Sequence, residues 1–295
     1  MLMRQLKFNV GRKSRWRFYL TVSMVFCAHV LTINIQGHED TLIRIAKINE
    51  TIAQDEISAK LLHRRARLYE EHCQWDRSLA DYRKALREDP DLTSAHLGAA
   101  RCYLRKRSAE RGLVEIDRFL DSSDGDQEGL LIRARLRTLA GRLHEASSDY
   151  HDALEVQAGV SPKVEIYFEW ASQLKKGGNE FYAEALKVVD TGLKQLGQNV
   201  ALQELAIELE LASRDYPRAL NRVEILLRGP LGGSPRWTFQ RAEILEALGK
   251  PNEALDAYQH LVERIHKMPA RRQNVTAIRA IKDSANRRIA ALASR

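Results

Sequence analysis

The chain has 295 residues, of which 44% are hydrophobic and 29% charged, and its formal net charge is +8. This is ordinary globular composition, long enough for two compact domains or one elongated array, and only seven prolines argue against long disordered stretches. Residues 1–17 hold six lysines and arginines and no acid, so subtracting those six leaves +2 for the rest of the chain. The basic excess is therefore N-terminal and does not indicate a nucleic-acid surface.

An export segment is predicted over residues 1–37. The six cations precede an apolar run from Phe18 to Ile33, and residues 18–37 contain no Lys, Arg, Asp or Glu. This order is typical of a secretory signal, and the positive-inside rule places the basic end in the cytoplasm and the rest of the chain across the membrane. We therefore expect an exported bacterial protein that is periplasmic, or anchored in the inner membrane with its main part outside the cytoplasm.

Whether this segment is removed stays open. The apolar run is short for a membrane span of about 20 residues, which favours cleavage after Gly37. Retention as a signal anchor would instead give membrane association through residues 18–37, and a buried helix of a cytosolic protein is a third alternative. If cleavage follows Gly37, the amine and imidazole of the new first residue, His38, could chelate copper, although an acidic helix start explains the same region.

A pattern recurs every 34 residues, three times in succession, at the start of a region that extends from residue 59 to residue 266. Three sets of residues carry it: the alanines Ala66, Ala100 and Ala134, the small residues Ser78, Gly112 and Ala146, and the larger Tyr82, Ile116 and Tyr150. Small side chains allow two helices to approach closely, so the period predicts pairs of helices that cross at these positions.

These residues resemble the tetratricopeptide repeat family, whose unit is a helix–turn–helix of 34 residues. The first three repeats are predicted at 59–92, 93–126 and 127–160, with Gly141 ending a first helix. A fourth begins near Ser161 with two extra residues in its turn, a fifth is degenerate, and a sixth is regular. The resemblance implies an all-α, right-handed superhelical solenoid of about six repeats that binds other molecules and is not an enzyme.

Capping helices are expected at both ends of the array, over residues 38–58 and 267–295. Apolar residues recur there at helical spacing: Leu42, Ile45, Ile48 and Ile52 in the first cap, and Val275, Ile278, Ile281, Ala285, Ile289 and Leu292 in the second. The tail from Val262 to Arg295 has nine lysines and arginines against two acids. It is either the solvated face of a cap or a basic amphipathic helix on an anionic membrane.

The candidate ligand-binding groove follows from the resemblance, which implies that positions 2, 5, 9, 12 and 13 of each first helix line a concave face. Position 9 is arginine in three successive repeats, and nearby groove positions are also basic. The predicted site comprises Arg67, Arg101, Arg135, Lys60, His63 and Arg105. Position 9 of the later repeats holds Ser172, Glu208 and Glu243. The groove is therefore expected to be basic in its N-terminal half and more acidic in its C-terminal half.

Two interpretations of the arginines stay open. They could hold an acidic peptide or a carboxylate through bidentate guanidinium hydrogen bonds. Alternatively, they pair with neighbouring glutamates such as Glu70, Glu71 and Glu128. Position 9 carries no asparagine, so the carboxylate clamp with which members of the family bind chaperones is not supported.

No catalytic, cofactor or metal pattern appears: the sequence lacks HExxH, CxxC, GxxxxGKS/T and GxSxG. Cys73 and Cys102 are expected to be small buried hydrophobes, with a bridge between them as the alternative. The sequence thus predicts a non-catalytic protein-binding scaffold or adaptor in the bacterial envelope, with a protein or peptide partner, which is acidic under the first interpretation of the arginines, and no nucleic acid. The alternatives are a membrane-anchored assembly subunit of an envelope or secretion complex, and an enzyme with a helical-repeat body.

Overall fold

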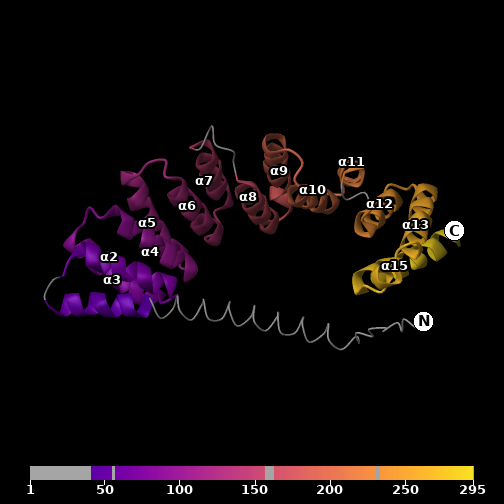
Figure 1. Ribbon diagram of the computed structural model, residues 1–295. Coiled ribbons are helices and arrows are strands. Elements are labelled where there is room, and N and C mark those ends of the chain that lie inside the picture. The colour runs from indigo at the N-terminus through magenta and orange to yellow at the C-terminus, as the bar shows by residue number, and fades with distance from the viewer. Residues whose placement is uncertain (1–40, 55–56, 157–162, 230–232, 295) are drawn as a thin grey trace, which may run out of the picture. The chain divides into compact units, whose positions relative to one another are not determined.

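The structure, a computed structural model, describes residues 41–54, 57–156, 163–229 and 233–294, and these residues form helices and no strand (Figure 1). Their contacts divide the chain after Ser123 into two compact units, an N-terminal unit and a C-terminal unit, which are described separately. The predicted export segment and the predicted start of repeat four at Ser161 lie outside the described residues. No helix within these ranges is long and apolar enough to cross a membrane.

The N-terminal unit contains a helix over residues 41–53 and two helix pairs. The pairs consist of α2 (Ala59–Glu71) with α3 (Trp75–Glu88), and α4 (Thr93–Arg105) with α5 (Ala109–Ser122). The first helix packs through Ile45 and Ile48 against Leu68. Leu42, which was predicted to belong to the same apolar stripe, is instead exposed.

Close approach inside the pairs depends on small residues, as the period predicted. Ala66 and Ser78 are fully buried where α2 crosses α3, and the Ser78 hydroxyl donates to the Ala66 carbonyl oxygen at 2.8 Å. Tyr82 fills the space between the repeats, and a Cβ atom at Gly98 on α4 would overlap its ring. Glycine at this position therefore lets the second repeat pack on the first.

The C-terminal unit continues the same pairing. Its helices are α6 (Gln127–Leu139), α7 (Leu143–Glu155), α8 (Val164–Gly177), α9 (Tyr182–Leu196), α10 (Val200–Ala212), α11 (Tyr216–Arg228), α12 (Pro235–Ala247), α13 (Pro251–His266), α14 (Ala270–Gln273) and α15 (Thr276–Ala293). The two extra residues of repeat four contribute to a 3-10 turn at Asn179–Phe181. Ala134 and Ala146 are both buried in the α6–α7 pair. The predicted all-α architecture of consecutive helix pairs is confirmed.

The C-terminal cap is a short helix followed by a long one. Ile278, Ile281 and Ile289 of α15 pack on the core that α12 and α13 form, whereas Val275 precedes the helix and is half exposed. The apolar stripe of α15 is thus used within the fold. This arrangement agrees with the prediction of a cap that has one solvated face.

The turns between paired helices place one residue in the left-handed region at the same position of the repeat. This residue is Cys73 with φ 55°, Arg107 with φ 56° and Gly141 with φ 77°, at the 34-residue period, and Arg214 and Gly249 in later repeats. Only glycine adopts this conformation without strain. The prediction that Cys73 is buried is wrong, because this turn leaves it exposed; Cys102 is buried, and both thiols are free.

Relief of this backbone strain should stabilise the protein. We expect Arg107→Gly and Arg214→Gly each to raise the free energy of unfolding by about 0.5–1 kcal/mol, since both side chains are exposed and form no ion pair with a described residue. Gly141→Ala, the reverse change at the same turn position, should lower it by about 1 kcal/mol. Urea denaturation measures all three, and a destabilised Arg107→Gly variant would contradict the strain argument.

Candidate functional site

The predicted groove of the N-terminal unit lies on α2 and α4, which contact each other. Lys60 and Arg67 lie on α2 and Arg105 ends α4; all three are exposed, and none forms an ion pair with a described residue. His63 is half-buried between them, with its ring centroid 5.5 Å from that of Tyr82. Four of the six predicted site residues are therefore accessible, or partly so, on neighbouring helices.

Arg101 is held by a carboxylate of the preceding repeat. Its Nε donates to Glu70 Oε1 at 2.7 Å, and the Tyr82 hydroxyl donates to Glu70 Oε2 at 2.9 Å. The alternative interpretation named Glu70 as a partner, and the structure agrees with it for Arg101. A ligand carboxylate at this position would have to compete with Glu70.

Arg135, in the C-terminal unit, is held in the same way by a different glutamate. Its Nε and Nη2 each donate to a Glu169 oxygen at 2.7 Å, and the Tyr150 hydroxyl donates to Glu169 at 3.1 Å. Burial raises the pKa of Glu169, but the hydrogen bonds from Arg135 and Tyr150 and the charges of Arg135 and Lys176 together leave this pKa below its ordinary value. The partner of Arg135 is thus Glu169, a residue the sequence analysis did not name. The location of Arg135 beside Arg67 and Arg101 on one surface stays a prediction.

A third group of the same kind joins α12 and α13 to the cap helix α15. Arg288 of the cap helix α15 donates through Nε to Glu246 at 2.9 Å, and the Tyr258 hydroxyl lies 3.5 Å from the same carboxylate. In all three groups, the carboxylate accepts hydrogen bonds from a tyrosine of a second helix and from an arginine of another helix. We call them the Tyr–Glu–Arg groups, and they connect successive helix pairs.

His63 reports on the electrostatic potential of the N-terminal groove. Burial lowers its pKa from the ordinary value of 6.5, a hydrogen bond with the backbone of Ser94 opposes this, and the charges of Arg67 and Arg101 lower it further. The charge of Glu70 opposes the two arginines, and burial remains the main reason why neutral imidazole is favoured near pH 7.

Removal of one of these charges should move the titration of His63. We expect Arg67→Ala to raise the pKa of His63 towards 6.5, because a nearby positive charge disfavours the imidazolium. NMR titration of the imidazole Cε1 proton measures this shift. Arg64→Ala, on the same helix, is the control and should change the pKa less. An unchanged pKa in Arg67→Ala would mean that Arg67 is screened from the groove.

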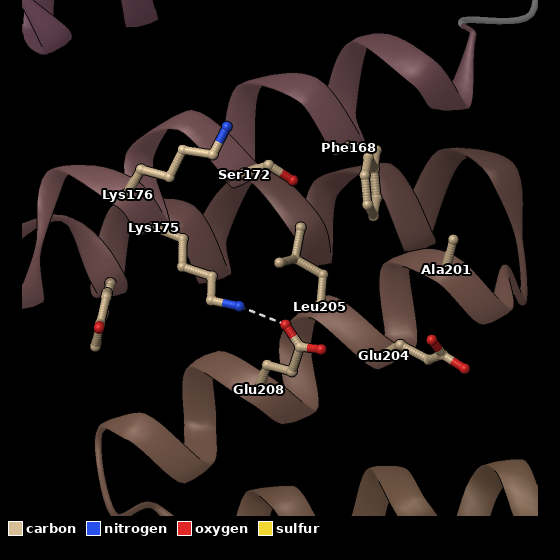
Figure 2. Close-up of a pocket in the computed structure, with 9 residues that line it drawn as sticks. Phe168, Ser172, Lys175, Lys176, Ala201, Glu204, Leu205 and Glu208 are labelled. Atoms are coloured by element: carbon tan, nitrogen blue, oxygen red, sulfur yellow. Dashed lines mark hydrogen bonds and ion pairs between the residues drawn. The ribbon is translucent and has the colours of Figure 1, made fainter. Parts of the chain in front are cut away.

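The C-terminal unit holds a cavity of about 400 Å³ between the first helices of repeats four and five (Figure 2). Its lining comes from α8, α9 and α10 and comprises Phe168, Ser172, Lys175, Lys176, Tyr182, Ala201, Glu204, Leu205 and Glu208. Counted from Val164 and Val200, these α8 and α10 residues mostly occupy positions 2, 5, 9, 12 and 13, which the resemblance assigned to the groove. We call this cavity the groove pocket.

The groove pocket combines an apolar centre with a charged rim. Phe168 is 42% exposed, and it is the one aromatic among the exposed large hydrophobic side chains of the described residues; Leu205 beneath it is buried. On the rim, Lys175 pairs with Glu208, as Figure 2 shows, and Glu204 Oε1 lies 3.2 Å from Arg236 Nη1. Lys176 is exposed and forms no ion pair with a described residue.

Sequence reasoning named only two residues of this pocket, Ser172 and Glu208, because it compared position 9 across repeats. Phe168 at position 5 and Lys176 at position 13 were missed, although the same position rule would have found them. The expected acidity of this half is offset here, since Lys175 and Arg236 pair with the two glutamates. In the described part of the chain, no group of three His, Cys, Asp or Glu side chains could hold a metal ion, and the copper idea at His38 lies outside it.

Comparison with known proteins supports the assignment of the repeats. The tetratricopeptide repeat model matches residues 59–92, the first predicted repeat, and a second model of the same description matches residues 205–267. These two segments are tetratricopeptide repeats. No curated protein matches its sequence.

Solved structures of tetratricopeptide repeat proteins have a similar fold. One from Parabacteroides merdae is 17% identical, with 84% of this chain and 93% of the other covered and a TM-score of 0.51. The C-terminal part of another, from Cytophaga hutchinsonii, is 13% identical, with 78% and 95% covered and a TM-score of 0.54. YrrB, described as having an unusual peptide-binding site, is 13% identical, with 62% and 91% covered and a TM-score of 0.45.

Proposed function

We propose that this tetratricopeptide repeat protein is a non-catalytic interaction scaffold that binds an extended segment of a partner protein along the first helices of its repeats. The groove pocket carries the proposal. An aromatic ring left 42% exposed beside a buried leucine offers apolar area that a partner side chain would cover. Its volume of about 400 Å³ lies in the range of ligand sites. Lys176 on the rim would favour an acidic residue in the same segment.

The predicted basic site of the N-terminal unit supports an acidic partner more directly. Lys60, Arg67 and Arg105 are accessible cations that form no ion pair with a described residue, so a carboxylate could approach them without breaking an ion pair seen in the structure. Arg101 and Arg135 would first have to leave Glu70 and Glu169. We therefore assign direct contact to Lys60, Arg67 and Arg105, and a supporting role to Arg101 and Arg135. His63 would gain a proton as the acidic segment binds.

A peptide array screened with the full-length chain tests the scaffold proposal, followed by titration of the selected peptides against two variants. Phe168→Ala should weaken peptides that occupy the groove pocket about 10-fold or more, because burial of a phenyl ring contributes about 1.5–3 kcal/mol. Arg67→Glu should weaken acidic peptides, and this loss should be smaller at high salt.

Val114→Ala is the matched control, because it removes an exposed hydrophobic side chain from α5, a second helix of a repeat. Circular dichroism checks the folding of each variant. Absence of any peptide that binds the folded chain would remove the scaffold proposal. Equal affinities for the native chain and for both groove variants would show that the partner uses another surface.

We also propose that residues 1–37 direct the protein out of the bacterial cytoplasm, which the order of cations and apolar residues supports. Mass spectrometry of the envelope fraction should find a chain that begins near His38. An intact N-terminus with carbonate-resistant membrane association would instead support the membrane-anchored assembly subunit. Recovery of the full-length chain in the soluble cytosol would exclude both.

A further inference from the structure

Residues 262–295 carry a net positive charge and contribute no residue to the predicted groove or to the groove pocket. Residues 262–295 contain nine lysines and arginines against Glu263 and Asp283, a net +7. Because residues 1–17 supply another +6 and the whole chain carries +8, the part between the two is acidic overall. The positive charge of the described residues is therefore concentrated at the end of the C-terminal unit.

Six of the nine cations form no ion pair with a described residue. Elsewhere in the described protein, the half-buried Arg65 and Arg135 and the buried Arg222 each contact a carboxylate. At the end of the chain the cations without an ion pair to a described residue are Lys267, Arg271, Arg272, Arg279, Lys282 and Arg287. We call these six residues the C-terminal basic surface. Arg288 is not part of it, since it binds Glu246.

These residues lie just after α13, on α14 and on α15, and the isoleucines of α15 are packed on the core. Since α15 uses Ile278, Ile281 and Ile289 to pack on the core, the cations lie on the sides of the helix that remain. The short helix α14 contacts α15 and carries Arg271 and Arg272. Val275, which is 50% exposed, lies in sequence between these arginines and Arg279. The C-terminal basic surface thus consists of cations in a segment whose one exposed large hydrophobic residue, within the described part of the chain, is Val275.

We propose that the C-terminal basic surface binds anionic phospholipid headgroups and holds the C-terminal unit against a membrane. Charge complementarity is the main argument, because each lysine or arginine near an anionic bilayer contributes about 1 kcal/mol. Val275 suits the headgroup layer, while α15 itself stays packed on the protein and does not insert. Residues 262–295 contain no Phe, Tyr or Trp on which a nucleic-acid base could stack, which favours a lipid surface over single-stranded nucleic acid.

Flotation of the full-length chain with vesicles tests this. One set is pure phosphatidylcholine and the other also contains phosphatidylglycerol. We expect binding that depends on phosphatidylglycerol and that is lost near 1 M salt, where the screening length is about 3 Å. The variant Arg271→Glu/Arg272→Glu/Arg279→Glu should lower this lipid-dependent partitioning about 100-fold, because each cation contributes about 5-fold. If the triple variant misfolds, Arg271→Gln/Arg272→Gln replaces it, and we expect this variant to show a smaller loss of lipid-dependent partitioning.

The matched control is Lys60→Glu/Arg64→Glu/Arg67→Glu, which changes the net charge equally on α2 of the N-terminal unit. It should retain most of the phosphatidylglycerol dependence. Equal loss in both triple variants would show an effect of net charge alone and overturn the proposal. Equal binding to both kinds of vesicle would also contradict the proposal, and insertion of residues 18–37 into the bilayer would give that result. Binding to duplex DNA without a preference for anionic vesicles would contradict it as well.

Discussion

Replacing Arg222 with methionine is expected to destabilise the C-terminal unit by about 3–5 kcal/mol. Arg222 is buried on α11, where its Nε lies 2.7 Å from Glu210 Oε1 and its Nη2 lies 2.6 Å from Asp190. Glu210 is fully buried, and its Oε2 accepts no hydrogen bond from a described residue. Methionine fills much of the space of the arginine stem but leaves the buried carboxylate without its main partner.

The size of this loss should depend on pH. Burial raises the pKa of Glu210 above the ordinary 4.5, and the hydrogen bond from Arg222 offsets part of this effect. Without Arg222 the pKa rises further, so ionised Glu210 opposes folding above that pKa. As the pH falls towards 4.5, Glu210 becomes neutral in the folded state and the penalty shrinks. Urea denaturation of the native chain and the variant at pH 7 and pH 5 gives the difference.

Arg218→Met on the same helix is the control for this experiment. Arg218 also approaches Glu210, at 3.4 Å, but its side chain is 51% exposed. Exposed pairs contribute about 0–1 kcal/mol, so the control should lose little stability. If Arg222→Met costs as much at pH 5 as at pH 7, an uncompensated Glu210 is not the cause of the loss.

Ala134→Leu is expected to overpack the crossing of α6 and α7 and to lower the free energy of unfolding by about 1–3 kcal/mol. Ala134 is fully buried, and it packs in one cluster with Tyr150 and Ile166. Three more carbon atoms at this point would have to move the tyrosine or separate the helices. Val200→Leu, at a residue that is 43% exposed at the start of α10, should change stability by less than about 0.5 kcal/mol. An unfolding midpoint for Ala134→Leu equal to that of the native chain would contradict the close crossing.

The fold could be predicted because its determinants are local and repeat at a fixed spacing. Ala66, Ser78 and Tyr82 recur as equivalents 34 residues later, and the size of a side chain is enough to locate a close crossing. Left-handed turn residues recur at the same period in the first three repeats, and of these three only Gly141 carries a sequence signal. Cys73 and Arg107 give no sequence signal for the left-handed conformation, because the neighbouring helices impose it on residue types that do not prefer it.

The candidate site was less predictable because it depends on partners distant in the sequence. Several glutamates were candidate partners of Arg135 in the sequence, and the partner in the structure, Glu169, is 34 residues away. Phenylalanine is a residue type that usually lies in the core, and only the positions of α8 and α10 show that the ring of Phe168 is partly exposed to solvent. Charge and residue type locate candidates, whereas pairing and exposure require the positions of neighbouring helices.

The arrangement in successive helix pairs also determines how the C-terminal unit should open. Each helix packs mainly on its sequence neighbours, so stability in such an array is additive and local. Seven side chains of α10 are buried, whereas α15 buries Ala285 and Leu292 and has a neighbour on one side. Amide hydrogens of α15 should therefore exchange with deuterium by fraying, well before those of α10, which require the interior of the array to open.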